Sequence, residues 1–124
     1  MSRRPTILLV EDDPGTRQLM ASLLGAEGYL VQTAGNGREA LALLETEVPC
    51  AMVVDLDMPV MDGAELRRHQ QDMPAAASVP FILVSGAHNA EGIARELGIA
   101  DIVAKPFDEA QLLRIIAAAC RRLD

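Results

Sequence analysis

The chain has 124 residues, half of them hydrophobic, and this length predicts one domain that buries roughly two thirds of the surface its unfolded chain exposes. Its 18 acidic and 11 basic residues give a net charge of −7, which disfavours nonspecific binding to nucleic-acid phosphates and favours a cation as ligand. With no tryptophan, one tyrosine and two phenylalanines, the core has to be built from aliphatic side chains.

The two cysteines, Cys50 and Cys120, belong to no CxxC or Cys/His spacing. We interpret them as small apolar residues, buried or half-buried, rather than as a redox pair or zinc ligands. The residues after Met1 lack the apolar core of a signal peptide, and no apolar run approaches the length of a membrane span. We therefore expect a cytoplasmic protein with no direct contact to a membrane or to nucleic acid.

Five short apolar runs bounded by turn residues predict strands. They are residues 6–10, 29–34, 51–54, 79–84 and 101–104. The run at 29–34 contains Gln32 and Thr33, so we expect it at an edge of the sheet. Five segments with apolar residues at helical spacing predict helices. They are residues 14–26, 36–47, 64–71, 89–97 and a final helix that starts at Asp108 and extends its apolar face to Leu123.

Strands that alternate with helices in this way form a parallel sheet, because each connection crosses over to the start of the next strand. The expected fold class is therefore α/β: a doubly wound five-stranded parallel sheet in a three-layer sandwich. With the second strand the most polar, we expect the flavodoxin-like order 2-1-3-4-5. The sequence shows no internal repeat or interdomain linker, so residues 1–124 are predicted to be a single domain.

Polar side chains suited to helix caps precede most of the predicted helices. They are Asp13, Asn36 (with Glu39), Asp62, Asn89 and Asp108. Arg67 and Arg68 are interpreted as solvated helix positions, and His69 and His88 as solvated surface histidines. None of these residues is expected to take part in catalysis or phosphoryl transfer.

Five reactive side chains follow the first, third, fourth and fifth strands of this predicted sheet. They are Glu11 and Asp12 after the first strand, Asp55 after the third, Ser85 after the fourth and Lys105 after the fifth. Parallel strands present their carboxyl ends at one edge, so these groups converge on one crevice. Clustered carboxylates repel one another unless a cation neutralises them, and Mg²⁺ prefers such oxygen ligands. The set suits phosphoryl transfer in which one oxygen of Asp55 attacks phosphorus.

These residues lie in four segments that together resemble the receiver domains of two-component response regulators. The segments are LLVEDD at 8–13, VVDLDMPVMDG at 53–63, ILVSG at 82–86 and KPF at 105–107. The resemblance covers almost the whole chain, in the order and spacing of the family. It implies a cytoplasmic signalling switch that catalyses its own phosphorylation and dephosphorylation, not an enzyme dedicated to turnover.

The resemblance also implies the role of each site residue. Asp55 is phosphorylated, Glu11 and Asp12 are the acidic pair, Asp57 gives Mg²⁺ its backbone carbonyl, Ser85 is the hydroxyl residue, and Lys105 contacts the phosphoryl group. The implied donor is a phosphohistidine of a sensor histidine kinase or histidine phosphotransfer protein. The implied recipient of the signal is a downstream effector protein or a fused output domain. A cis peptide before Pro106 is a further implication.

Two positions depart from the family pattern. Ser85 stands where threonine is common, which keeps the hydroxyl and removes a methyl group. Ile102 stands where the family usually has Tyr or Phe, whose ring turns inward as the hydroxyl residue moves. Isoleucine is smaller and stiff at χ1, so it cannot reproduce that motion. We therefore expect phosphorylation to be intact, and output to use the loop after Ser85 and the fourth helix more than a rotamer change at Ile102.

Two other functions fit parts of the sequence. Asp55 and Asp57 also resemble the DxD pair of haloacid-dehalogenase-type phosphatases, although there the pair follows the first strand and further acidic residues come late. Alternatively, Ile102 marks a binding module that keeps the fold without using phosphorylation. All the residues that phosphoryl transfer needs are present, so the switch is the interpretation we adopt.

Overall fold

The structure, a computed structural model, describes residues 4–121 and confirms the alternation of five strands with five helices. The strands are β1 (Thr6–Val10), β2 (Leu30–Ala34), β3 (Ala51–Asp55), β4 (Phe81–Ser85) and β5 (Asp101–Ala104). The helices are α1 (Pro14–Ala26), α2 (Gly37–Thr46), α3 (Gly63–Gln71), α4 (Ala90–Glu96) and α5 (Glu109–Arg121). Leu123, expected on the last helix, lies outside the described residues.

Two strands begin later than predicted, because the amide of the first residue predicted for each strand donates a hydrogen bond within the preceding turn. The Tyr29 amide donates to Leu24 O at 3.3 Å, which makes it part of the end of α1, where Gly28 has a φ of 96°. The Val79 amide likewise donates to Ala76 O at 3.1 Å. Because Pro80 has no amide hydrogen to give, β4 starts at Phe81 and extends one residue further than expected, to Ser85.

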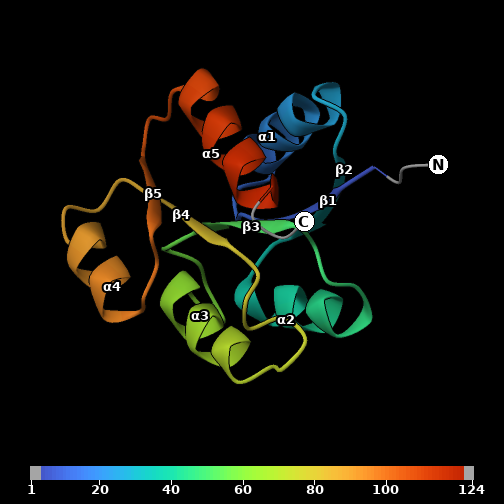
Figure 1. The fold of residues 1–124 in the computed structure, drawn as a ribbon. Coiled ribbons are helices and arrows are strands. Elements are labelled where there is room, and N and C mark those ends of the chain that lie inside the picture. Colours follow the sequence, from blue (N-terminus) through green and yellow to red (C-terminus); the bar gives the residue numbers. More distant parts are fainter. Residues whose placement is uncertain (1–3, 122–124) are drawn as a thin grey trace.

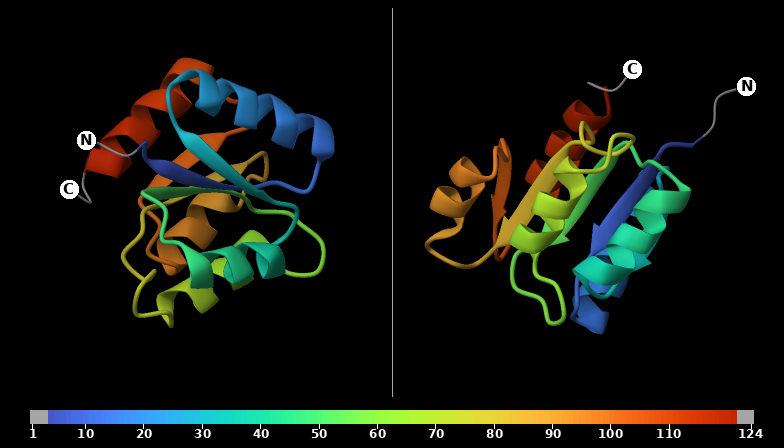
Figure 2. Two further views of the ribbon diagram at one scale, coloured as in Figure 1. Left: turned by 90° about the vertical axis from the view of Figure 1, so that its right-hand side faces the viewer. Right: turned by 90° about the horizontal axis from the view of Figure 1, so that it is seen from below.

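The strands form one parallel sheet in the predicted order β2-β1-β3-β4-β5. Helices α1 and α5 cover one face, and α2, α3 and α4 cover the other, so the molecule has three layers (Figure 1). The last turn of α5 lies at one end of the sheet, and the β1–α1 and β3–α3 loops lie at the opposite end (Figure 2, left). Within residues 4–121, no helix is long and apolar enough to cross a bilayer.

The core is divided by the sheet into two aliphatic clusters. Met52 and Val54 of β3 point toward α2, α3 and α4, whereas Ala51 and Val53 point toward α1 and α5. All four side chains are at most 1% exposed. This burial on both faces explains why the central strands are continuous apolar runs rather than alternating ones.

Cys50 and Cys120 form a disulfide, which corrects the interpretation of these residues as unpaired. Their Cα atoms are 4.9 Å apart although 70 residues separate them in the chain. Both are half-buried, as expected, and pack against the cluster beneath α1 and α5. The pairing escaped the sequence because it depends on how α5 lies across the start of β3, which no local spacing encodes.

Arg67 is not the solvated residue we expected. Its Nε and Nη2 donate to the carbonyls of Leu97 and Gly98 at 3.0 and 3.1 Å, which ties α3 to the end of α4. Its guanidinium also lies over the Phe81 ring, 5.6 Å from the centroid. Burial lowers the pKa of Arg67 from its usual value.

The Arg67 contacts continue into a buried amide. Arg67 Nη1 donates to Gln70 Oε1 at 2.8 Å, and Gln70 Nε2 donates to the carbonyls of Ala76 and Val79 at 2.8 and 2.9 Å. The Gln70 side chain is fully buried, so these bonds satisfy groups that water cannot reach. The network fixes the loop between α3 and β4.

Most of the predicted helix caps are present, and one is wrong. Asp13, Asn36 and Asp62 each accept a hydrogen bond from the amide three residues on, and Asp108 accepts from the amide of Ala110. Asn89 occupies the cap position of α4 but makes no such bond. Its backbone, at φ −94° and ψ 6°, is not in the extended conformation that a capping side chain needs.

Replacing Gln70 with leucine tests the buried network. We expect Gln70→Leu to lower the free energy of unfolding by about 2 kcal/mol, because two carbonyls and the Arg67 guanidinium each lose a partner. Urea unfolding followed by circular dichroism measures this. Gln18→Leu, at an exposed position of α1, is the matched control and should change stability little. Equal effects of the two substitutions would contradict a structural role for Gln70.

Candidate functional site

The pairing of the strands sets which side chains meet at their carboxyl ends. Val10 of β1 lies opposite Val54 of β3, so Glu11 follows β1 beside Asp55. The Glu11 amide continues the ladder by donating to Ala34 O at 3.0 Å. On the other side, Ser85 pairs with Ala104 of β5, which brings Lys105 to the same edge.

Three carboxylates and the single lysine of the chain form the centre of this edge. Glu11, Asp12 and Asp55 each offer a carboxylate oxygen within 4.8 Å of the others. Lys105 Nζ is 3.2 Å from Glu11 Oε1 and 3.3 Å from Asp55 Oδ1. Glu11 and Asp55 are buried and Asp12 is exposed, so the cluster opens to solvent on the Asp12 side. Oxygen donors at this spacing are suited to a hard divalent cation.

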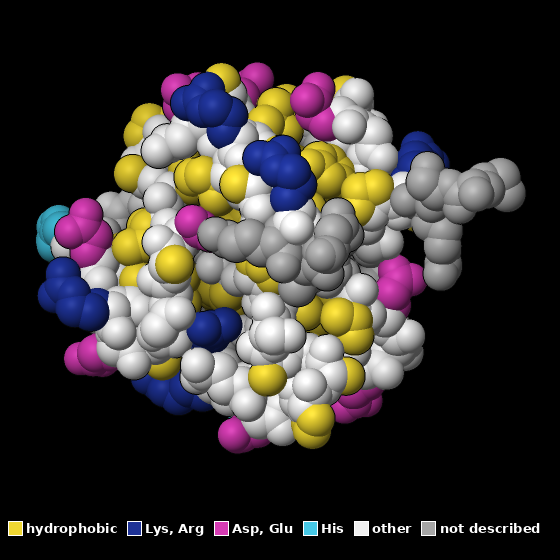
Figure 3. Space-filling model, in the orientation of Figure 1, with side chains coloured by type: hydrophobic (Ala, Val, Ile, Leu, Met, Phe, Trp, Pro, Cys, Tyr) yellow, Lys and Arg dark blue, Asp and Glu magenta, His cyan; other side chains and the backbone are white. Residues whose placement is uncertain are grey.

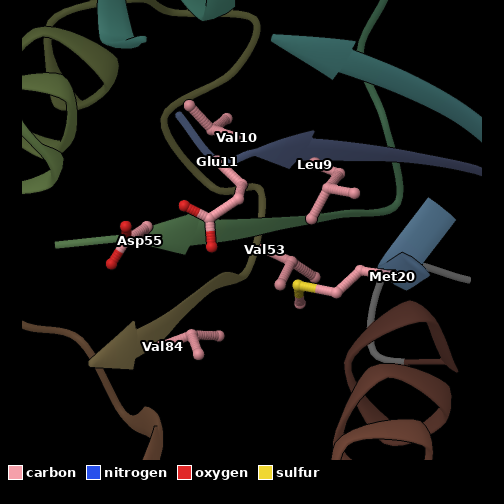
Figure 4. A pocket seen from close by; sticks show the side chains of 7 residues that line it. All are labelled: Leu9, Val10, Glu11, Met20, Val53, Asp55 and Val84. Carbon is pink, nitrogen blue, oxygen red and sulfur yellow. The ribbon is translucent and has the colours of Figure 1, made fainter. Parts of the chain in front are cut away.

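The surroundings of the two buried carboxylates are apolar. Figure 4 shows Glu11 and Asp55 side by side at one end of a pocket, with aliphatic side chains lining the rest of it. Burial by itself lowers the pKa of Lys105, but Asp55 and Glu11 more than offset this, and the pKa lies above the usual lysine value. The lysine is therefore charged when the carboxylates are charged, and it balances part of their repulsion.

The β1–α1 loop, which carries Glu11 and Asp12, is held from α1. Arg17 Nη1 donates to Glu11 O at 2.9 Å. Asp13 Oδ2 accepts from the amide and hydroxyl of Thr16 at 2.8 and 2.7 Å, and the Thr16 hydroxyl is the main reason that the pKa of Asp13 is lowered. Sequence reasoning gave Arg17 no role. The only sequence signal for a role of Arg17 is that a basic residue follows the acidic pair by about one and a half helical turns.

The β3–α3 loop folds back tightly on the end of β3. The Gly63 amide donates to Leu56 O at 2.9 Å, and a Cβ at Gly63 would lie only 2.7 Å from Asp55 O. Within the loop, Asp57 is exposed, and Val60 is exposed with a φ of 69°, a conformation that β-branched residues rarely adopt. Gly63 is therefore required by the close approach of α3 to the backbone of Asp55.

Ser85 ends β4 as a buried hydroxyl next to the lysine segment. Its Oγ accepts from the Ala87 amide at 3.0 Å, and its carbonyl accepts from the Lys105 amide, also at 3.0 Å. The peptide bond between Lys105 and Pro106 is cis, in agreement with the resemblance. Because the hydroxyl accepts from Ala87, its own hydrogen is free to donate to a group bound in front of the sheet.

Ile102, the residue at the expected switch position, lies on β5 opposite Leu83 of β4. It is half-buried and packs against the cluster that includes Ala90 and Ala94 of α4. Ile102 thus contacts the layer that contains α4 and is not part of the acidic centre.

Comparisons with known proteins agree with this site. The response regulator receiver domain model matches residues 7–117, so the chain belongs to the response regulator receiver family. This match decides against a haloacid-dehalogenase-type phosphatase. The chain is therefore a module of two-component signalling rather than a turnover enzyme.

Two curated relatives illustrate the range of lengths. The chain is 39% identical over 116 residues to an uncharacterised 14.6 kDa protein from the sodA1 3′ region of Leptolyngbya boryana, covering 92% of this chain and 88% of the relative. It is 32% identical over 126 residues to the "Probable transcriptional regulator ycf27" of Guillardia theta, covering 98% of this chain and 48% of that protein. The chain thus spans about half the length of several curated relatives.

Solved structures show the same fold. The signal receiver domain of a signal transduction histidine kinase from Syntrophus aciditrophicus has a TM-score of 0.89 and 28% identity, covering 97% of this chain and 92% of that one. The receiver domain of the sensor histidine kinase PA1611 from Pseudomonas aeruginosa PAO1 has a TM-score of 0.85 and 30% identity, covering 95% and 98%. The latter structure has a magnesium ion coordinated in its active-site cleft.

Adding one methyl group at Gly63 tests the contact with Asp55. We expect Gly63→Ala to lower the free energy of unfolding by about 1–3 kcal/mol, because the new Cβ would meet backbone atoms that cannot move aside. Chemical denaturation measures the change. Gly25→Ala is the matched control, since a Cβ there has no atom within 4 Å, and it should stabilise α1 by roughly 0.5–1 kcal/mol. Destabilisation by both substitutions alike would contradict this account.

The raised pKa of Lys105 has a defined consequence for stability. Since the folded value lies above the ordinary 10.5, the contribution of the charged lysine is complete below pH 10.5 and is lost as the pH rises through the folded value. Because Lys105 is the only lysine, an NMR titration of its side chain is unambiguous. We expect the pKa to fall when Glu11→Gln and Asp55→Asn are combined. An unchanged pKa would show that the carboxylates do not cause the shift.

Proposed function

We propose that this chain is a phosphoryl-accepting signalling switch, in which Asp55 receives a phosphoryl group from a phosphohistidine of a partner protein. The observation that carries the proposal is the pairing of two buried carboxylates, Glu11 and Asp55, with the single lysine at one edge of the sheet. Membership of the receiver family supports it. The partner is a sensor histidine kinase or a histidine phosphotransfer protein, and the signal passes to a downstream effector or a fused output domain.

The reaction forms one bond and breaks one. An Asp55 oxygen attacks phosphorus, the phosphorus–nitrogen bond of the donor histidine breaks, and the departing imidazole nitrogen takes up a proton. The product is an acyl phosphate on Asp55. With Oδ1 beside Lys105 Nζ, Oδ2 is the oxygen left for attack. Hydrolysis of the acyl phosphate by water later restores the carboxylate and releases inorganic phosphate.

Two residues of the chain are positioned to balance the charge that arrives. Lys105 is held between Glu11 and Asp55, so its ammonium lies next to Oδ1 of the carboxylate whose other oxygen becomes phosphorylated. The Ser85 hydroxyl, which accepts from the Ala87 amide, donates its hydrogen to a phosphoryl oxygen, because phosphoryl oxygens only accept. Preorganised donors of this kind stabilise developing charge without having to be rearranged.

We propose Mg²⁺ as the cofactor, because the donor set consists of carboxylate oxygens within 4.8 Å of one another. Asp12 and Asp55 would hold the ion, Glu11 would act through water, and Asp57 would contribute its backbone carbonyl. When bound, the ion supplies positive charge beside the phosphoryl oxygens. The magnesium in the Pseudomonas aeruginosa receiver structure supports this assignment. We place the protein in the cytoplasm, where the kinase domains of such systems work.

The experiment that tests the proposal is intact mass after incubation with acetyl phosphate, with and without Mg²⁺. We expect one phosphoryl adduct on the native chain, and none when Mg²⁺ is chelated. Asp55→Asn should give no adduct, whereas Asp62→Asn, which alters only the cap of α3, should still give one. Absence of an adduct on the native chain, together with no response to beryllofluoride, would make the protein a phosphorylation-independent module.

The route of output gives a second prediction. Beryllofluoride, which imitates the phosphoryl group, should shift amide NMR signals of residues 86–97, because this segment starts at Ser85 and continues into α4. Asp55→Asn is the control and should abolish the shifts. Unchanged signals over 86–97, with changes elsewhere, would show that the signal leaves the site by another route.

A further inference from the structure

The cystine lies outside the phosphoryl site, and the proposed function does not use it. Cys50 directly precedes β3, and Cys120 is in the last described turn of α5. Their Cα separation of 4.9 Å falls within the range in which a disulfide closes without movement of the backbone. They are the only two cysteines of the chain, so no other thiol of the protein competes for either sulfur.

The bond joins two elements that meet nowhere near Asp55. It fastens the end of α5 to the start of the strand whose opposite end holds the phosphoacceptor. In Figure 1 this end of the molecule faces the viewer, and the site loops lie behind. The last turn of α5 contains one buried residue, Ala119, and Ile116 is the buried residue one turn before it. The disulfide therefore restrains the C-terminal end of α5.

We propose that Cys50 and Cys120 form an exchangeable redox couple that reacts with glutathione. Disulfides in cytoplasmic proteins are rare and are usually transient or redox-sensing, so a disulfide in a cytoplasmic chain points to exchange. This step rests on the cytoplasmic location given under the proposed function. Both cysteines are half-buried residues rather than members of the fully buried core.

The exchange is balanced by glutathione alone. One glutathione thiolate attacks a cystine sulfur, which forms a mixed disulfide and releases one protein thiolate. A second glutathione thiolate then attacks the mixed disulfide, so that the protein becomes a dithiol and glutathione disulfide leaves. The two protein sulfurs each gain one electron and one proton, and two glutathione molecules lose them. Charged side chains of both signs are scattered over the face of the molecule at this end (Figure 3).

The couple is tested on the native chain in buffers of varied ratio of reduced to oxidised glutathione. After the free thiols are blocked with iodoacetamide, intact mass separates the dithiol, which carries two alkyl groups, from the disulfide, which carries none. We expect the two populations to interchange reversibly as the ratio changes. A chain that stays disulfide at every ratio is a fixed cross-link, and one that stays dithiol never forms the bond; either result overturns the proposal.

Amide hydrogen exchange tests whether the redox state of Cys50 and Cys120 changes the local stability of α5. Reduction should speed exchange severalfold at the amides of the last turn of α5 and leave α3 unchanged, because the bond holds the end of α5 and does not involve α3. The double variant Cys50→Ala with Cys120→Ala should behave like the reduced chain in every buffer. Equal exchange in both redox states would overturn the fastening role. The assay uses no phosphoryl donor, so its failure is distinct from failure of Asp55 phosphorylation.

Discussion

Two carboxylates buried at neighbouring strand ends repel each other unless a positive charge lies between them, and Lys105 supplies that charge. Glu11 and Asp55 belong to adjacent strands, whereas Lys105 arrives from the far edge of the sheet by pairing its amide with Ser85. The lysine is therefore in place only when β1, β3, β4 and β5 are all in register. The charge centre therefore depends on the pairing of four strands and is not a property of any single loop.

The main features of this arrangement were predictable from local sequence. Apolar runs that stop at a charged residue mark both a buried strand and its polar end, as at Val54 and Asp55. Once alternation with helices implies a parallel sheet, the polar ends have to meet at one edge. Cap residues such as Asn36 were predictable for the same reason, because their bonds reach only three residues along the chain.

The features that could not be predicted depend on contacts between distant segments. Arg67 looks like any arginine on a polar helix, and only the position of α4 gives it two carbonyls to bind. The pairing of Cys50 with Cys120 likewise depends on where α5 ends over the sheet. The predicted cap at Asn89 was wrong for the opposite reason. The side chain is of a suitable type, but the backbone of Asn89 does not adopt the capping conformation.

The two ends of α4 are restrained to different extents, because the hydrogen bonds from Arg67 act only at its C-terminal end. The carbonyls of Leu97 and Gly98, directly after α4, are bonded to Arg67 of α3, while the first turn of α4 follows the loop after Ser85 and has no side-chain cap. Seven helical residues span about 10 Å, so α4 is a short rigid rod that is fixed at one end. A small tilt about the fixed end displaces the first turn most, next to Ala90 and the residues that contact Ile102.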